Sequence, residues 1–445
     1  MKSLVSVAGL DPTSGAGITK DLEIFAGLGF HGIGIPTSIV VQGPGGVKSI
    51  SRIPLGTFEE MLKVFESEEI ELSGVKTGVL VGEEYVKTIS GMLSNLKKAG
   101  KPVVVDPVLK AKNGYELLSR EGIEALKGFV LPKCTILTAN VEEAQILADS
   151  KIEDLDNMRE CAKRLKDLGP EVVIIKGGHL SGDPVDVYYD GHSFIEKEKV
   201  RLEKEVHGTG CVFSSSLLGF LARGLNPREA FFEAENLTFS LIKDSYRINA
   251  DGYYYPSLYE RLRTNAERFE AISSLREIRE RLERLNPVEL IPEVQMNICY
   301  AIPDARTVED VCAYPGRISK HKGRILIKSD PEFGASSHVA RTLLAFMKFF
   351  PEMRSCANVK FDKSLLEKAK KNGLKVVLAD RKSEPESIKE KEGRSLEFLV
   401  EKSLSSANFV PDIIYDEGDI GKEPMIRLFA RNPFELLEKM EKLLR

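Results

Sequence analysis

The sequence predicts two α/β domains, of which the first has a mostly parallel sheet with helices on both faces. Short β-branched apolar runs alternate with amphipathic segments through residues 1–255, a pattern typical of such sheets. A charged helical segment follows, and then a second, smaller set of strands and helices begins. The length of 445 residues also exceeds what one hydrophobic core usually serves.

The expected strands of the first domain are short and end in Gly, Asp or Asn. They are SLVSVAG, GIGIPTSIVV, PVVVDPV, CTILTAN and EVVIIKGG. The helices expected between them cover Lys20–Leu28, Phe58–Glu68, Glu84–Lys98, Asn140–Ala148 and Asn157–Leu168. A later polar section predicts antiparallel edge strands with a hairpin turn at Asp190-Gly191, and two long helices begin near Gly210 and Pro227.

The charged segment LYERLRTNAERFEAISSLREIRERLERL marks the domain boundary, which we place near residue 265. We therefore expect a first domain over 1–265, a helical linker over 266–285 and a second domain over 286–445. The strands expected in the second domain are VQMNICYAI, GRILIKS, KVVLAD and DIIYD. Because each part has its own apolar runs, we expect each to fold alone.

The composition argues against several classes of protein. A net charge of −4 provides no general attraction to nucleic acid or to an anionic membrane. The sequence has no run of about 18 apolar residues, and its first residues do not resemble a signal peptide, so we expect a cytoplasmic protein. The six cysteines form no CxxC pair and the six histidines no HExxH motif, which argues against a structural metal site.

The stretch HGTGCVFSSSLLGFLARG, from residue 207 to 224, predicts an anion site. Gly208 and Gly210 permit backbone conformations that point consecutive N–H groups, including that of Thr209, toward one place. The helix that begins near Cys211 adds its positive end, and phosphate is the natural ligand. The alternative is a plain glycine turn before a core helix.

Polar residues at the ends of neighbouring strands strengthen the phosphate interpretation, because ligands of parallel sheets bind at that edge. Lys176 ends EVVIIK and can neutralise a phosphate, while Asp106 ends PVVVD. Asn140 and Glu143 form an N-x-x-E pattern that suits a hydrated Mg²⁺ with nucleotide phosphates. Taken singly, each could instead be a cap or a surface charge. GPGGVKS lacks the glycine before Lys48 that a Walker A loop requires, so another kind of phosphate site is expected.

These residues lie in motifs that resemble the hydroxymethylpyrimidine/phosphomethylpyrimidine kinases, ribokinase-like enzymes of thiamine biosynthesis. The motifs are, in order, AGLDPTSGAGITKDL, SIVVQGPGGV, VKTGVL, VVVDPVLKAKNG, LTANVEEAQIL, VIIKGGH and HGTGC. The resemblance covers nearly all of residues 1–255. It implies two phosphorylations that use ATP and Mg²⁺, first of a pyrimidine's hydroxymethyl group and then of the resulting monophosphate.

The resemblance also implies a catalytic role for Cys211, where many ribokinase-like sugar kinases have an aspartate base. A helix N-terminus lowers the pKa of a thiol, so we expect Cys211 to be partly thiolate. Phosphoryl transfer depends mostly on positioning and charge neutralisation, so a weak base suffices. We also hypothesise that a cysteine tolerates a phosphate nucleophile in the second step, where a fixed carboxylate would repel it.

For the pyrimidine, the resemblance implies that Gln42 reads the ring nitrogen and the amino group, since an amide donates and accepts at once. The alternative is a strand-end amide that caps a turn. Gly9 and Asp11 are expected on the loop lining the pyrimidine pocket, and Val79 stands where relatives commonly have methionine. Lys112, in KAKNG, is expected on a mobile loop that covers the site.

In the second domain, loop motifs dense in Arg, His and Asp favour a polyanion site with a metal. They are PGRI, FGASSHVAR, MRSCANVKFD, ADR and PDIIYDEGDIGKEPMIRLF. These motifs resemble the archaeal thiamine-phosphate synthase domain that is fused behind the pyrimidine kinase, over roughly residues 288–445. The resemblance implies that hydroxymethylpyrimidine diphosphate and thiazole phosphate are joined, with release of diphosphate.

Arg317 in PGRI suits a bidentate phosphate contact, and His338 begins a helix where it can donate to an anion. The alternatives are a surface arginine and a helix-capping histidine. The weaker candidates, for phosphate or for Mg²⁺, are Ser336, Ser337, Arg341, Asp416, Asp419 and Lys422.

Two other functions stay open. The second domain resembles regulators that sense a ligand, but those pair it with a DNA-binding helix-turn-helix, whereas here Arg317 and His338 are present. A pyridoxine-type kinase is disfavoured by Gln42 together with Cys211. The expected partners are small molecules only (hydroxymethylpyrimidine and its phosphates, ATP and thiazole phosphate), without nucleic acid or membrane, and a homo-oligomer is compatible with the sequence.

Overall fold

The computed structural model describes residues 1–43, 46–67, 70–178, 183–250, 252–381, 394–405, 409–419 and 422–445. The chain divides into two compact units, Met1–Leu262 and Arg263–Arg445. Glu68, the expected end of one helix, and the centre of GPGGVKS lie outside the described residues. Within the described part, no helix has the length and apolarity needed to span a membrane.

Unit 1 is built on one nine-stranded sheet. Its strands, in spatial order, are β3 (Gly46–Arg52), β2 (His31–Gly43), β1 (Ser3–Leu10), β4 (Leu72–Thr77), β5 (Val103–Val105), β6 (Ile136–Asn140), β7 (Val172–Lys176), β8 (Val185–Tyr189) and β9 (Phe194–Glu198). The strands from β2 to β7 in this order are parallel, and β3, β8 and β9 are antiparallel additions at the edges. The predicted mostly parallel sheet is confirmed.

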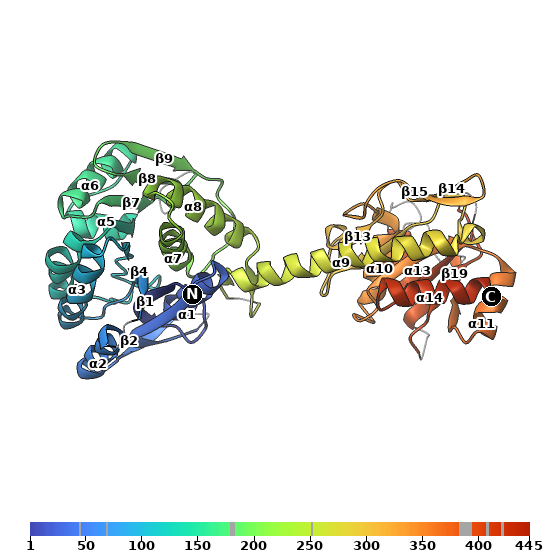
Figure 1. Cartoon of the computed structure of the whole chain (residues 1–445), viewed down its shortest axis with the longest axis horizontal. Helices are drawn as coiled ribbons and strands as arrows, with labels where there is room; N and C mark the ends of the chain where they lie inside the picture. The colour runs from blue at the N-terminus through green and yellow to red at the C-terminus, as the bar shows by residue number, and fades with distance from the viewer. Residues whose placement is uncertain are drawn as a thin grey trace. The chain divides into compact units, whose positions relative to one another are not determined.

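Helices cover both faces of this sheet, as predicted (Figure 1). One face carries α2 (Leu55–Ser67), α3 (Glu83–Lys98), α4 (Arg120–Ala125), α5 (Val141–Ala148) and α6 (Leu155–Asp167). The other carries α1 (Gly17–Gly27), α7 (Thr209–Ala222) and α8 (Pro227–Lys243). Shorter elements are η1 (Leu126–Val130), η2 (Leu131–Lys133), β10 (Tyr246–Arg247) and β11 (Tyr254–Tyr255). Two buried apolar layers thus hold the parallel strand ends in place.

Strand β4 was not among the expected strands. Its sequence LSGVKT carries a glycine and Lys76 inside the apolar run, which breaks the pattern of a buried strand. The strand forms because β1 and β5 pair with it on either side and an acidic partner neutralises Lys76. The five expected strands correspond to β1, β2, β5, β6 and β7.

Unit 2 is built on a seven-stranded sheet in which only β18 and β19 are parallel neighbours. The order is β16 (Glu332–Phe333), β13 (Val311–Ala313), β12 (Ile298–Ala301), β17 (Ser355–Lys360), β20 (Met425–Ala430), β19 (Ile413–Asp416) and β18 (Val376–Leu378). One face packs against α9 (Leu258–Leu285), α11 (Lys363–Lys371) and α14 (Pro433–Leu444), and the other against α10 (Ser337–Met347) and α13 (Arg394–Ser405). The remaining elements are η3 (Val288–Leu290), η4 (Val308–Asp310) and the hairpin of β14 (Ile318–His321) and β15 (Arg324–Ile327).

Helix α9 corrects the expected linker. Ala271, Leu275, Ile278 and Leu282 recur every three or four residues along it and are buried in the core of unit 2. The segment 266–285 is therefore part of the folded second unit, and its many charges lie on the opposite, solvated side of the helix. The sequence interpretation missed these apolar positions because charged residues dominate the composition of the segment.

Candidate functional site

Two helix N-termini meet at Cys211. Helix α7 begins two residues earlier, and α1 begins at Gly17, whose backbone N–H donates to the Cys211 sulfur at 3.4 Å. Neither N-cap residue, Ala16 or Gly208, caps its helix with a side chain. The first N–H groups of a helix lack partners within the helix, so the junction of α1 and α7 brings together backbone donors of a kind that suits an anion.

Close backbone approach explains the glycines of this junction. Gly208 has φ +78°, and a Cβ there would lie 1.8 Å from the carbonyl oxygen of Gly15. Gly17 has φ +61°, and its Cβ would lie 2.2 Å from the carbonyl oxygen of Gly9. Only glycine fits both positions, because the turn before α7 touches the backbone of the loop before α1, and the start of α1 touches the backbone at the end of β1.

The structure brings Lys176 and Asp106 to the first turn of α7. A Cβ on Gly210 would lie 3.3 Å from Lys176 Nζ and 3.6 Å from Asp106 Oδ2. The two side chains pair at 3.3 Å, and Ser214 donates to Asp106 at 3.2 Å. Burial opposes the charge of Lys176, but Asp106 and Glu143 outweigh it and raise the pKa of the lysine. Lys176 is therefore a cation held next to the first turn of α7.

Asn140 and Glu143 form a capping box at the start of α5. The Asn140 side chain accepts from the Glu143 N–H at 2.9 Å, and Glu143 accepts from the Asn140 N–H at 2.8 Å. Burial raises the pKa of Glu143 to about 8, with Lys176 opposing the shift. The N-x-x-E pattern thus has a structural role first, and it also holds a carboxyl group within the electrostatic reach of Lys176 and Asp106.

No group of three or more acidic, histidine or cysteine side chains surrounds a common metal position among the described residues. Protein sites for Mg²⁺ commonly use only one or two carboxylates and complete the shell with water and substrate phosphates. Asp106 and Glu143 are two carboxyl groups that lie within electrostatic reach of Lys176, which is compatible with a Mg²⁺ site of this kind.

A buried ion pair that the sequence interpretation missed lies next to Cys211. Lys76 Nζ is 2.7 and 2.9 Å from the two carboxylate oxygens of Asp21, and Ser6 and Ser215 each donate to the same carboxylate at 2.6 Å. All four are fully buried. Ser215 follows Cys211 by one turn of α7, so the pair is fixed to the same helix. The only sequence signal was a lysine within an apolar strand.

The expected thiolate at Cys211 is wrong for the protein without ligands. Burial raises the pKa of the Cys211 thiol to about 11, and the charge of Lys76 opposes this shift only in part. Desolvation of the sulfur therefore outweighs the helix N-terminus. At neutral pH Cys211 is an uncharged thiol.

The residues expected around the pyrimidine gather at the ends of β1 and β2. A Cβ on Gly9 would meet Val40 at 2.9 Å and Val79 at 3.7 Å. The Asp11 carboxylate accepts hydrogen bonds from the N–H and hydroxyl of Thr13 and the N–H of Ala16 in its own loop, and from the His207 ring. Asp11 thus stabilises the conformation of the loop.

Gln42, the second-last residue of β2, makes a further side-chain hydrogen bond to Asp11. Burial alone would raise the pKa of Asp11, but hydrogen bonds from His207, Gln42 and Thr13 lower it. Lys112 contacts the residue before His207. Its Nζ donates to Val206 O at 3.0 Å and lies 5.0 Å from the Tyr253 ring centre. Burial lowers the pKa of Lys112. The KAKNG loop therefore contacts the segment that leads into α7.

In unit 2 the structure does not join Arg317 to His338. Arg317 is exposed with φ +60°, and its Nη1 donates to Val294 O. His338 is exposed in the first turn of α10, and its ring has no partner among the described residues. Ser336 is the N-cap of α10, with Ser337 and Arg341 within its first turns.

Two arginines engage Asp416, which was a candidate for phosphate or Mg²⁺. Its carboxylate accepts from Arg381 Nε at 2.5 Å and Nη2 at 3.2 Å, from Arg427 Nη1 at 2.7 Å and from the Gly418 N–H at 3.0 Å. Burial opposes ionisation, but the two arginines outweigh it and lower the pKa of Asp416. Asp419 and Lys422 pair backbone to backbone at a turn. The sequence interpretation missed Arg381 and Arg427 as individual residues.

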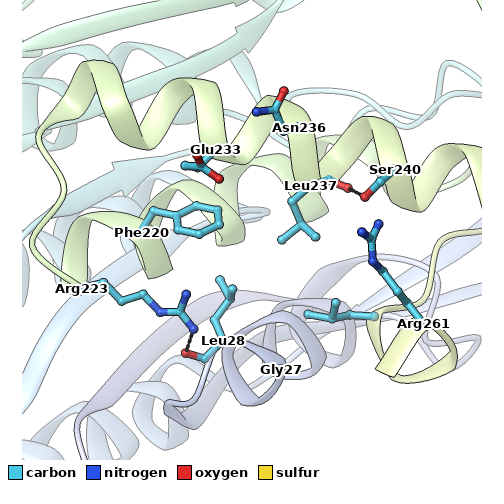
Figure 2. Close-up of a pocket in the computed structure, with 10 residues that line it drawn as sticks. Gly27, Leu28, Phe220, Arg223, Glu233, Asn236, Leu237, Ser240 and Arg261 are labelled. Atoms are coloured by element: carbon cyan, nitrogen blue, oxygen red, sulfur yellow. Dashed lines mark hydrogen bonds between the residues drawn. The ribbon is translucent and has the colours of Figure 1, made fainter. Parts of the chain in front are cut away.

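A shallow groove of unit 1 lies away from these residues (Figure 2). Arg223 lies at one end of it and donates to Leu28 O at 2.6 Å. Its lining residues are Gly27, Leu28, Phe220, Arg223, Glu233, Asn236, Leu237, Ser240, Leu258 and Arg261. None of them is among the residues of the α1–α7 junction described above, so the groove is separate from that junction.

Comparison with known proteins covers both units. A model of the phosphomethylpyrimidine kinase family matches residues 11–255, and one of the thiamine-phosphate synthase ThiN family matches residues 274–442. The bifunctional thiamine biosynthesis protein ThiDN of Methanocaldococcus jannaschii is 32% identical over 444 residues, 98% of this chain and 97% of that protein. The hydroxymethylpyrimidine/phosphomethylpyrimidine kinase of Aquifex aeolicus is 35% identical over 55% of this chain and 95% of its own.

Solved structures share the ribokinase-like fold of unit 1. The pyridoxal kinase of Staphylococcus aureus in complex with AMP-PCP and pyridoxal has a TM-score of 0.53 at 30% identity, over 59% of this chain and 95% of that one. The pyridoxal kinase of Bacillus subtilis in its ADP complex has a TM-score of 0.52 at 29% identity, over 59% and 99%. The chain belongs to the phosphomethylpyrimidine kinase family and, along its whole length, to the bifunctional thiamine biosynthesis enzymes that join this kinase to a thiamine-phosphate synthase.

Proposed function

We propose that the junction of α1 and α7 holds the phosphate that the kinase transfers from ATP. The observation that carries this proposal is the meeting of two uncapped helix N-termini at Cys211, with Lys176 beside them. Gly208, Thr209 and Gly210 offer the N–H groups of the α7 start. Donors fixed in advance at such a place stabilise the charge that develops during transfer.

The kinase makes two transfers onto one pyrimidine. In the first, the hydroxymethyl oxygen bonds to the γ-phosphorus, the bond to ADP breaks and the hydroxyl proton is released. In the second, an oxygen of the monophosphate is the nucleophile; it is already ionised and has no proton to lose. The raised pKa of Cys211 supports our hypothesis that an uncharged group stands here, because a carboxylate would repel the second nucleophile.

We propose that Asp106 and Glu143 hold Mg²⁺ together with water and the nucleotide phosphates, where the ion neutralises phosphate charge. Asn140 then acts by fixing Glu143 through the capping box. Lys112 contacts phosphate from the KAKNG loop. Withdrawing Mg²⁺ with a chelator should abolish both transfers, and phosphorylation of hydroxymethylpyrimidine by the chelated enzyme would contradict the assignment.

The pyrimidine is proposed to bind at the ends of β1 and β2, where Gln42 reads its amino edge. Gly9 and Val79 form an apolar wall close to each other. Asp11 positions the loop and, through its hydrogen bond, the Gln42 amide.

The charge argument is tested by Cys211→Asp. An aspartate carries a charge where the thiol carries none, so the second transfer should slow more than the first. The matched control, Cys211→Ser, keeps an uncharged group and should leave the ratio of the two rates close to that of the unchanged enzyme. Steady-state rates with hydroxymethylpyrimidine and with its monophosphate give that ratio. Equal slowing of both transfers by Cys211→Asp would contradict the proposal.

We propose that unit 2 carries the synthase site and that Arg317 and His338 serve it. In the condensation, the thiazole nitrogen bonds to the methylene carbon of the pyrimidine, the carbon–oxygen bond breaks and its electron pair leaves with diphosphate. Arg317→Ala and His338→Ala should slow this step and leave the kinase rates unchanged. If the unchanged protein binds thiamine phosphate but forms none, unit 2 is a sensor.

A second activity is proposed from the solved structures. Two pyridoxal kinases share the fold of unit 1 at 30% and 29% identity, below the 35% of the Aquifex aeolicus pyrimidine kinase. We propose slow phosphorylation of pyridoxal at the same site, and competition with hydroxymethylpyrimidine would test it. A pyridoxal rate that hydroxymethylpyrimidine does not inhibit would contradict a shared site.

We also propose that the enzyme works in the cytoplasm, where ATP and Mg²⁺ are supplied, and that it forms a homo-oligomer. The supporting fact for the location is the dependence of the kinase family on ATP. Sedimentation analysis gives the oligomeric state, and a monomer at micromolar concentration would contradict the second part.

A further inference from the structure

Unit 2 contains a buried cluster in which two arginines share one aspartate. Arg381 follows β18, Asp416 ends β19 and Arg427 lies on β20, so residues distant in sequence converge at one edge of the sheet. Arg381 is 7% exposed, Arg427 6% and Asp416 not at all. Two guanidinium groups and one carboxylate leave a net positive charge in a nearly buried place.

Stability alone does not account for such a cluster. Taking charges out of water is costly, and well-packed apolar residues often replace a buried ion pair without loss of stability. Within the part of the chain that the structure describes, the two guanidinium groups share this one carboxylate. Among the described residues, only Nη1 of Arg427 has a protein partner, which leaves Nε and Nη2 as donors. The Arg427 side chain as a whole keeps a solvent exposure of 7%.

Arg317 and the cluster lie at the same end of the strands of this sheet. The Arg317 side chain donates to Val294 O, and the next residue, Gln295, accepts from Asn358 Nδ2 at 2.8 Å. Asn358 is paired directly with Arg427 across β17 and β20. A short chain of contacts therefore connects the exposed arginine with the buried pair. The edge as a whole carries three guanidinium groups.

We propose that Arg381 and Arg427, braced by Asp416, bind a phosphate group of a phosphorylated substrate of unit 2. Guanidinium groups fixed by a carboxylate present planar donor pairs that match phosphate oxygens, and their ordering is completed before the ligand arrives. Asp416 thus positions the arginines. The proposal rests on the synthase function of unit 2, whose two substrates and two products all carry phosphate or diphosphate.

The first test measures binding of inorganic diphosphate and of inorganic phosphate to the full chain by calorimetry. Arg427→Gln removes the free donors and should weaken diphosphate binding at least tenfold, and Arg427→Lys, which keeps the charge, should weaken it less. The matched control is Lys439→Met, which removes another nearly buried cation of unit 2, paired with Asp412 and Glu435. This control should bind diphosphate as the unchanged chain does.

The second test separates the two sources of the phosphate group. If the cluster holds the diphosphate of the pyrimidine substrate, Arg427→Lys raises the KM for that substrate alone. If it holds the thiazole phosphate, only that KM rises. Either result supports the proposal and names the ligand.

Two results would overturn it: no measurable diphosphate or phosphate binding by the unchanged chain, or equal losses in Arg427→Lys and Lys439→Met. Failure of the synthase function has a different signature. In that case the unchanged chain binds diphosphate, Arg427→Gln loses this binding and no thiamine phosphate forms, so the anion site stands in a domain that only binds its ligand.

Discussion

Replacing Lys76 with methionine tests the ion pair next to Cys211. The substitution leaves the Asp21 carboxylate without its cation in a place that solvent does not reach. Removing one partner of a buried ion pair costs about 3–5 kcal/mol. The hydroxyls of Ser6 and Ser215 still donate to the carboxylate, so we expect about 3 kcal/mol, a large share of a typical domain stability of about 5–15 kcal/mol.

Calorimetric unfolding of the full chain gives this number, with an ATP analogue used to identify the transition of unit 1. The double variant Lys76→Met/Asp21→Leu removes both charges and should recover most of the loss, since apolar residues can replace a buried pair. A loss below about 1 kcal/mol for the single variant, or a double variant no more stable than the single one, would refute the reasoning.

Three further predictions follow from the site and the core. The rate at which iodoacetamide alkylates Cys211 should rise with pH and reach half of its maximum near pH 11, because the thiol is protonated below its pKa of about 11. A rate that is already constant below pH 9 would contradict the buried thiol. Gln42→Leu should weaken pyrimidine binding by about 1–3 kcal/mol and leave ATP binding unchanged, and calorimetry with each ligand decides; equal weakening of both would remove its proposed role. A fragment of residues 258–445 should fold cooperatively, whereas 286–445 should not, because it lacks the stripe of α9 that fills the core of unit 2. Circular dichroism during heating distinguishes the two fragments, and a cooperative transition in the shorter one would show that α9 is dispensable.

Much of the fold of unit 1 could be predicted because the sequence patterns of its strands are local. Runs such as EVVIIK and PVVVD are apolar throughout, since both faces of a parallel sheet are covered. Strand β4 escaped notice because Lys76 interrupts its run, and only a partner on another element makes that lysine tolerable. Helix α9 was misinterpreted as a linker for the opposite reason: its charges dominate the composition, while a stripe of apolar positions decides its packing.

The candidate site divides in the same way. Lys176 and Asp106 could be placed together because both end parallel strands, whose carboxyl ends share one edge. The convergence of α1 with α7 at Cys211, and that of Arg381 with Arg427 on Asp416, depend on contacts between residues far apart in sequence. The raised pKa of Cys211 could not be predicted either, because it depends on how deeply the thiol is buried, and a sequence motif does not show burial.

One measurement tests the central claim, that this chain alone carries out both halves of the synthesis. The full chain is incubated with hydroxymethylpyrimidine, ATP, Mg²⁺ and thiazole phosphate, and the mixture is followed by mass spectrometry. We predict that the pyrimidine monophosphate and diphosphate appear in turn and that thiamine phosphate then accumulates with inorganic diphosphate. Accumulation of the pyrimidine diphosphate beside unchanged thiazole phosphate would contradict the account.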